Sequence, residues 1–171
     1  MKSKYLAAIC IVIAAFSVYA VWDFNGGSFD FSDRQAILIV TDSMDGDVHD
    51  YKIGSFPADT LVIVEHLTEQ EKRFLRVGDV ISYDSNGILE HHRIIESHSD
   101  FYYVHGDKNH STERVNLDKI NGVVVGANPI LGKAIAFIEG NFLLFLAIMF
   151  VICSAMIIMG MYRRDPKEEV S

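Results

Sequence analysis

Residues 80–95 read VISYDSNGILEHHRII, and this stretch decides the fold. Branched and aromatic residues on each side of Asn86-Gly87 predict two strands, residues 80–83 and 88–95. Asn-Gly is the strongest short-range signal for a β-hairpin, because both residues tolerate the positive φ angles of its turn. The stretch therefore predicts an antiparallel hairpin.

Four further runs in the chain have the same branched and aromatic character, with turn residues between them. They are residues 37–40, 61–64, 101–104 and 123–125. Thr68 and Glu71 have the spacing of a capping box and predict a short helix over residues 68–76. The fold expected is mainly β: a domain of short antiparallel strands with one short helix.

Two apolar runs flank this domain, residues 5–22 and 142–162. As helices they would be about 27 and 31 Å long, enough to cross the hydrocarbon core of a bilayer. Lysines precede the first run and arginines follow the second, which predicts that both termini, residues 1–4 and 163–171, are cytoplasmic. Residues 23–141 would then form one exported domain at a cell membrane. A cleaved signal peptide is the alternative for the first run.

The composition of the chain argues against several partners and reactive groups for the exported domain. The net charge of −8 argues against nucleic acid as a partner, since nucleic acid requires a basic face. Both cysteines, Cys10 and Cys153, lie in the apolar runs. The domain between them is therefore expected to hold no disulfide and no thiol nucleophile, and we expect no cofactor.

A serine, a histidine and a carboxylate occur in order along the chain. Ser43 follows the apolar run 37–40, and Asp107 follows the predicted strand 101–104. Because side chains alternate along a strand, His91 and His92 face opposite sides of the sheet, and only one can serve a given site. These three residue types are the smallest set from which a protein builds a peptide-cleaving nucleophile. The Ser43 backbone N–H would be one donor to the oxyanion.

Five sequence boxes resemble, in order, those of type I signal peptidases of the archaeal and endoplasmic-reticulum kind. The boxes are Thr41-Asp42-Ser43-Met44, Val77-Gly78-Asp79-Val80-Ile81-Ser82-Tyr83, His92-Arg93-Ile94, Gly106-Asp107-Lys108-Asn109 with Glu113-Arg114, and Val124-Val125-Gly126 through Leu131-Gly132-Lys133. Two positions depart from the family pattern. Gly46 stands where the family usually has proline, and Glu113 stands where it has aspartate.

The resemblance implies a membrane-bound serine endopeptidase with a signal-peptidase-like β domain. Its substrates would be the signal peptides of exported preproteins, and its partners would include membrane lipid and, in some members, secretion-channel or accessory subunits. By resemblance, Ser43 is the nucleophile, His92 the general base and Glu113 the acid that completes the triad. Asp107 would support the site through hydrogen bonds, and the Thr41 hydroxyl would be a second oxyanion donor.

Two other functions remain open from the residues alone. All seven histidines lie outside the apolar runs, and His105, Asp107 and His110 have side chains suited to metal binding, although their spacing matches no tight metal motif. An exported metal-binding domain and a non-catalytic membrane adaptor are therefore the alternatives. The lysines Lys72 and Lys108 are interpreted as solvated charges rather than catalytic amines.

Overall fold

The computed structural model describes residue 13, residues 16–17, residue 20, residues 25–109 and residues 111–162. The chain divides into two compact units. One is Gly27–Ala136, and the other combines the described residues before Gly27 with those from Phe137 onward. Most of the predicted apolar segment 5–22 lies outside the described residues, as do the two predicted tails.

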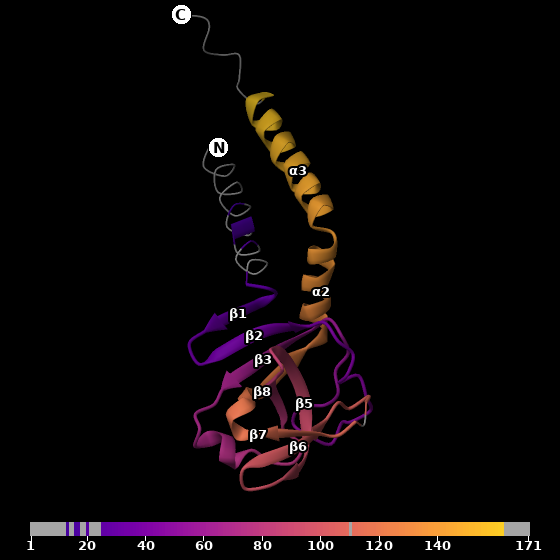
Figure 1. The fold of residues 1–171 in the computed structure, drawn as a ribbon. Helices are drawn as coiled ribbons and strands as arrows, with labels where there is room; N and C mark the ends of the chain where they lie inside the picture. Colours follow the sequence, from indigo (N-terminus) through magenta and orange to yellow (C-terminus); the bar gives the residue numbers. More distant parts are fainter. Residues whose placement is uncertain (1–12, 14–15, 18–19, 21–24, 110, 163–171) are drawn as a thin grey trace, which may run out of the picture. The chain divides into compact units, whose positions relative to one another are not determined.

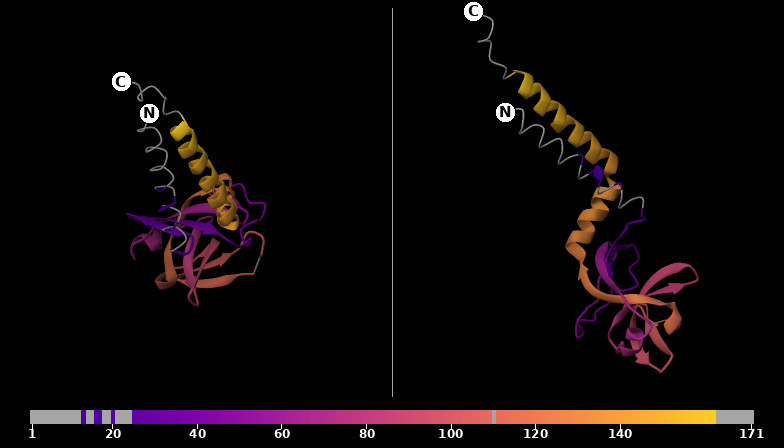
Figure 2. Two further views of the ribbon diagram at one scale, coloured as in Figure 1. Left: turned by 90° about the horizontal axis from the view of Figure 1, so that it is seen from above. Right: turned by 90° about the vertical axis from the view of Figure 1, so that its left-hand side faces the viewer.

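The first unit contains one antiparallel sheet of eight strands, drawn in Figure 1. The strands are β1 (Ser28–Phe31), β2 (Arg34–Ile39), β3 (Thr60–His66), β4 (Val80–Ser85), β5 (Ile88–Ser97), β6 (Phe101–His105), β7 (Glu113–Asn116) and β8 (Ile120–Asn128). Their order in the sheet is β1-β2-β3-β8-β4-β5-β6-β7. The prediction of a mainly β, antiparallel domain is confirmed. The views of Figure 2 show that the sheet is strongly twisted.

The hairpin predicted from residues 80–95 is present as β4 and β5. Val80 pairs with Arg93, and the register continues to the pair Ser85 and Ile88. Asn86 and Gly87 have φ angles of 56° and 84°, which is the left-handed backbone that a two-residue hairpin turn requires. The register therefore places Tyr83 opposite Glu90 and Ile81 opposite His92.

Two apolar clusters form the core, one on each face of β4. Val80 belongs to one cluster and its neighbour Ile81 to the other, because successive side chains of a strand point to opposite faces. The first cluster contains Ile81, Tyr83, Ile94 and Tyr102, with Leu75, Val104, Val115, Leu117 and Ile120. The second contains Val80, Met44 and Phe56, with Ile39, Val62, Val64 and Val124.

The predicted helix over residues 68–76 is wrong in length. The structure has only a 3-10 helix, η1 (Glu71–Phe74), although the capping contacts are present. Glu71 Oε2 accepts hydrogen bonds from the Thr68 backbone N–H at 2.8 Å and from the Thr68 hydroxyl at 2.7 Å. A second 3-10 helix, η2 (Leu117–Lys119), precedes β8. A cap sets where a helix begins, but Phe74 is 78 % exposed and provides no packing that would extend it.

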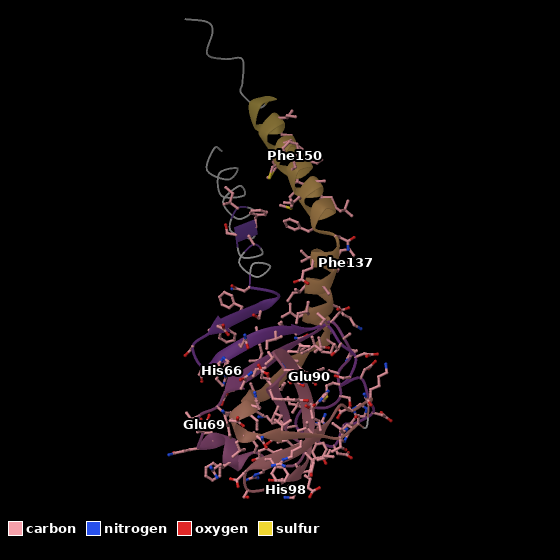
Figure 3. All side chains as sticks on the ribbon, in the orientation of Figure 1. His66, Glu69, Glu90, His98, Phe137 and Phe150 are labelled. Carbon is pink, nitrogen blue, oxygen red and sulfur yellow. The ribbon has the colours of Figure 1, made fainter. Side chains whose placement is uncertain are left out.

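Two α-helices follow the sheet. Helix α2 (Pro129–Gly140) was not predicted, although its start has a sequence signal: Asn128 Oδ1 accepts the Leu131 N–H, and Pro129 occupies the first turn. Helix α3 (Phe142–Tyr162) coincides with the predicted apolar run. Phe137 and Phe150, labelled in Figure 3, are exposed. Among the described residues, no helix is both long enough and apolar enough to cross a membrane.

Candidate active site

Ser43 lies in a tight turn directly after β2. The Asp45 N–H donates to the Asp42 carbonyl at 3.0 Å and closes this turn around Ser43. The next side chain, Met44, is 1 % exposed and packs in the second core cluster. Burial of Met44 therefore anchors the turn, while Ser43 itself stays partly accessible.

The loop after β6 holds the backbone of this turn on its other side. The Lys108 N–H donates to the Ser43 carbonyl at 2.9 Å. A Cβ added to Gly106 would lie 2.6 Å from the Ser43 oxygen, and one added to Gly46 would lie 2.5 Å from the Asp107 oxygen. Both approaches are too close for any side chain, so the two loops fit together only with glycine at these positions. Gly46, the departure from the family pattern, thus has a local steric reason.

Asp107 forms a buried ion pair with Arg93. The Arg93 Nε and Nη2 donate to the two Asp107 oxygens at 2.8 and 2.6 Å, and the side chains are 3 % and 0 % exposed. The Ser55 hydroxyl adds a third hydrogen bond to Asp107 at 2.7 Å. Asp107 therefore organises the loops around Ser43, as a supporting residue would.

His92 is the centre of a second polar cluster. Its Nδ1 lies 2.7 Å from the Tyr83 hydroxyl oxygen, and that hydroxyl lies 2.7 Å from Glu113 Oε2 and 3.1 Å from Glu90 Oε2. Glu90 Oε2 is also 3.7 Å from His92 Nδ1. Glu113 thus reaches His92 through the tyrosine rather than directly. Figure 3 labels Glu90, which lies near the start of β5.

Electrostatics favour a neutral imidazole at His92. Partial burial lowers the pKa of His92 below its usual value, because desolvation penalises the imidazolium. The carboxylates of Glu90 and Glu113 oppose this effect, but they do not cancel it. In a neutral imidazole whose Nδ1 carries the proton, Nε2 is unprotonated, which is the state that a general base requires.

One cavity brings the serine and the histidines together. Its volume is about 320 Å³, and it is lined by residues 37–41, 43, 44 and 88–92. Thr41, the predicted oxyanion donor, is exposed and belongs to this lining. No hydrogen bond joins Ser43 Oγ to His92 within the described residues. What the two residues share is their place in the lining of this cavity. Catalytic hydrogen bonds are often longer before substrate binds.

His91 differs sharply from its neighbour. It is 8 % exposed, and its Nε2 is buried without a hydrogen-bond partner in the described part of the chain. Burial lowers the pKa of His91 to about 4, and the nearby His92 adds to the effect. His91 is therefore neutral at physiological pH. Side chains alternate along β5 as predicted, but His91 and His92 both line the cavity with Ser43, so alternation alone does not select one of them for this site.

The metal ligands considered from sequence are not brought together. The Asp107 carboxylate is occupied by Arg93, His105 Nδ1 lies 2.8 Å from the Gly106 carbonyl, and His110 lies outside the described residues. A different group, Glu90, His92 and Glu113, has ligand atoms within 4.8 Å of one another. The Tyr83 hydroxyl lies among these atoms and already contacts all three residues.

Sequence reasoning missed Tyr83 and Glu90. The signal for both was present, because the Asn86-Gly87 turn fixes the hairpin register and so places Tyr83 opposite Glu90, two residues before His92. The reach of Glu113 towards the same point had no such local signal, since it depends on the curvature of the whole sheet.

Comparison with known proteins gives no family. No protein-family profile matches this chain, and no curated protein matches its sequence.

Proposed function

We propose that this chain is a membrane-associated serine endopeptidase that removes signal peptides from exported preproteins. The observation that carries the proposal is the shared cavity: Ser43 and His92 come from separate parts of the sequence and line the same hollow beside β5. A carboxylate, Glu113, is linked to the far nitrogen of that histidine. These residues supply the three kinds of group that serine hydrolysis uses, which supports the proposal.

The proposed reaction begins with attack of Ser43 Oγ on the scissile carbonyl carbon. His92 Nε2 accepts the hydroxyl proton and then transfers it to the departing amine, which leaves Ser43 acylated. Water, deprotonated by the same nitrogen, hydrolyses the ester and restores the serine. The Ser43 N–H and the Thr41 hydroxyl would donate to the oxyanion in both steps. Glu113 would stabilise the imidazolium that forms in each.

The cavity suits an extended peptide with small apolar side chains. Its lining is mostly apolar, and it lies beside the end of β2, where Val40 is 79 % exposed. An extended substrate segment can pair with exposed strand backbone while alternate side chains enter pockets. Signal peptides end in small residues before the cleavage site, which matches such a recess.

Membrane attachment rests on the two apolar runs. Helix α3 contains no charged residue over Phe142–Tyr162, and its large apolar side chains Leu144, Phe150 and Val151 are 57 %, 74 % and 65 % exposed. Exposed apolar side chains along a helix are stable in lipid and costly in water. With cytoplasmic termini, the Ser43 domain would face the exported side, where cleavage sites emerge.

Cleavage of a preprotein by the full chain in detergent tests the proposal. Ser43→Ala and His92→Ala should each lower kcat by a factor on the order of 10⁴ or more, because members of one catalytic unit fail together. Thermal unfolding should change little, since neither side chain belongs to the apolar core. The measurements are the initial cleavage rate and the unfolding midpoint of each variant.

Ser99→Ala and His98→Ala are the matched controls. Both residues are exposed at the turn between β5 and β6, so their removal should leave the rate at the wild-type level. Wild-type rates in Ser43→Ala would exclude Ser43 as the nucleophile and with it the proposed function.

A metal site is the second candidate function, and the cluster of Glu90, His92 and Glu113 favours it. Carboxylate oxygens and an imidazole nitrogen are ligands for Zn²⁺. Chelator treatment separates the two functions: a metal hydrolase would lose activity, whereas the serine enzyme would keep it.

A further inference from the structure

The Tyr83 hydroxyl occupies an unusual position within the polar cluster. Tyr83 is 1 % exposed, and its oxygen contacts His92 Nδ1, Glu113 Oε2 and Glu90 Oε2 at 2.7, 2.7 and 3.1 Å. One phenolic proton serves three contacts that each need a proton. The positions of the protons in the cluster can therefore be deduced by counting donors and acceptors.

The count fixes the state of the imidazole. A tyrosine phenol ordinarily loses its proton only at about pH 10, so the Tyr83 hydroxyl carries its proton at neutral pH. That proton goes to Glu113, the nearer carboxylate, because an ionised carboxylate can only accept, and the longer 3.1 Å contact with Glu90 is then left without a proton. The 2.7 Å contact with His92 is then a hydrogen bond only if Nδ1–H donates to the tyrosine oxygen. In this tautomer Nε2 has no proton.

We propose that Tyr83 is a positioning residue: its hydroxyl links Glu113 to His92 and holds the imidazole in the tautomer with a free Nε2. The inference rests on the proposed function and adds a fourth residue to it. Tyr83 contacts neither substrate nor reacting atoms. It acts through His92 alone.

Sheet geometry gives the reason why an intermediary is needed. Strands β5 and β6 pair with each other, and β6 pairs with β7, so Glu113 on β7 is two strands away from His92. Two strand spacings separate the backbones by about 10 Å, and although ligand atoms of Glu113 and His92 come within 4.8 Å of each other, no direct hydrogen bond joins them among the described residues. Tyr83 reaches the gap from β4, on the opposite side of β5. Its long, rigid ring brings a hydroxyl to the point between the two.

Tyr83→Phe tests the role, with Tyr102→Phe as a matched control. Both tyrosines are 1 % exposed and belong to the same core cluster, but the Tyr102 hydroxyl donates to the Lys72 carbonyl, away from the site. Tyr83→Phe should lower kcat for preprotein cleavage roughly 10- to 100-fold with little change in KM, since it removes the hydroxyl that joins the neutral His92 ring to the ionised Glu113. Tyr102→Phe should stay within about twofold of wild type, because the loss of a neutral hydrogen bond far from the site leaves the base unaltered.

Nitrogen-15 NMR of histidine in the full chain in detergent provides a readout that does not depend on activity. His92, assigned by comparison with His92→Ala, should show a protonated Nδ1 and an unprotonated Nε2 in wild type and in Tyr102→Phe. In Tyr83→Phe this preference should weaken into a mixture of tautomers. The wild-type spectrum is decisive even if Tyr83→Phe does not fold.

Three outcomes have distinct meanings. A protonated Nε2 in the wild type would overturn the proposed link. An unchanged kcat and tautomer in Tyr83→Phe would do the same. If the tautomer is as expected but wild-type protein and Ser43→Ala cleave equally, the link stands and the peptidase function fails.

Discussion

The Arg93–Asp107 pair and the cluster around His92, on opposite faces of strand β5, differ in how their polar groups are satisfied. On one face Arg93 meets Asp107 with two short hydrogen bonds, and its Nη1 donates to the backbone carbonyls of Ile53 and Gly78 at 2.8 Å. On the other face His92, Tyr83 and two carboxylates share fewer protons than they have acceptors. Neighbouring residues of one strand thus serve different purposes.

This difference suggests that the Arg93–Asp107 pair has a structural role and that the cluster around His92 has a chemical one. The buried ion pair is held rigidly, because four of the five Arg93 N–H donors are hydrogen-bonded and the Asp107 carboxylate accepts three hydrogen bonds. Among the described residues only Nδ1 of the His92 ring has a hydrogen-bond partner, and the charge of this ring depends on the carboxylates around it, which is typical of functional sites. We therefore expect substitution of Arg93 or Asp107 to affect folding, and substitution of His92, Tyr83 or Glu113 to affect rate.

The largest expected effect on stability is that of Asp107→Ala. It leaves the Arg93 guanidinium buried and unpaired, which costs about 3–5 kcal/mol of unfolding free energy. Glu113→Ala should instead lower the cleavage rate more than Asp107→Ala does in the fraction that remains folded, while leaving the unfolding free energy nearly unchanged. Denaturant titration and initial rates of both variants measure these effects.

Glu65→Ala is the control for this pair of variants. It removes an ion pair with Arg34 at 3.0 Å that is largely exposed, so it should change stability very little. A stable Asp107→Ala protein with no activity would move Asp107 from the structural face to the catalytic one and contradict the comparison.

His91 provides a smaller effect that depends on pH. Its pKa is about 4 in the folded chain and about 6.5 when unfolded, so the unfolded state binds a proton first as the pH falls. Stability should be complete above pH 6.5 and decline towards pH 4, by a total on the order of 3 kcal/mol. His91→Gln should flatten this decline in unfolding titrations, whereas the exposed His98→Gln should not. Equal acid sensitivity in all three proteins would contradict the buried, neutral state of His91.

Local sequence signals predicted the parts of the molecule that depend on local chemistry. The Asn86-Gly87 turn gave the hairpin, its register and the opposite facing of His91 and His92. The short edge strands β1 and β7 were missed, because pairing with neighbouring strands, rather than a strong apolar pattern of their own, stabilises them. The predicted length of the helix after Thr68 was wrong for a similar reason. Tertiary packing, and not the cap, sets how far a helix extends.

The candidate site was predictable as a set of residues but not as a set of contacts. Ser43, Thr41 and His92 line one cavity, as a shared site requires. The different partners of Asp107 and Glu113 follow from the sheet order β5-β6-β7 and from the fit of Gly106 against Ser43, both of which arise from long-range packing. No spacing rule in the sequence encodes either of them.

The smallest expected effect is a shift in the acid limb of the cleavage rate. Only neutral His92 can act as a base, so the rate should fall as the pH drops through its pKa. Sequence alone places that limb near 6.5, but burial lowers the pKa of His92 and should move the limb to lower pH. Glu90→Gln removes a carboxylate that raises this pKa, so it should move the limb lower still.

A lysine base would behave differently, because its limb would lie far above neutral pH. The ion pair with Asp42 raises the pKa of Lys108 and keeps it charged, so Lys108→Ala should leave the limb in place. Rates measured from pH 4 to 9 for wild type, Glu90→Gln and Lys108→Ala distinguish these cases. A limb that follows Lys108 rather than Glu90 would assign the base to the lysine and return His92 to a structural role.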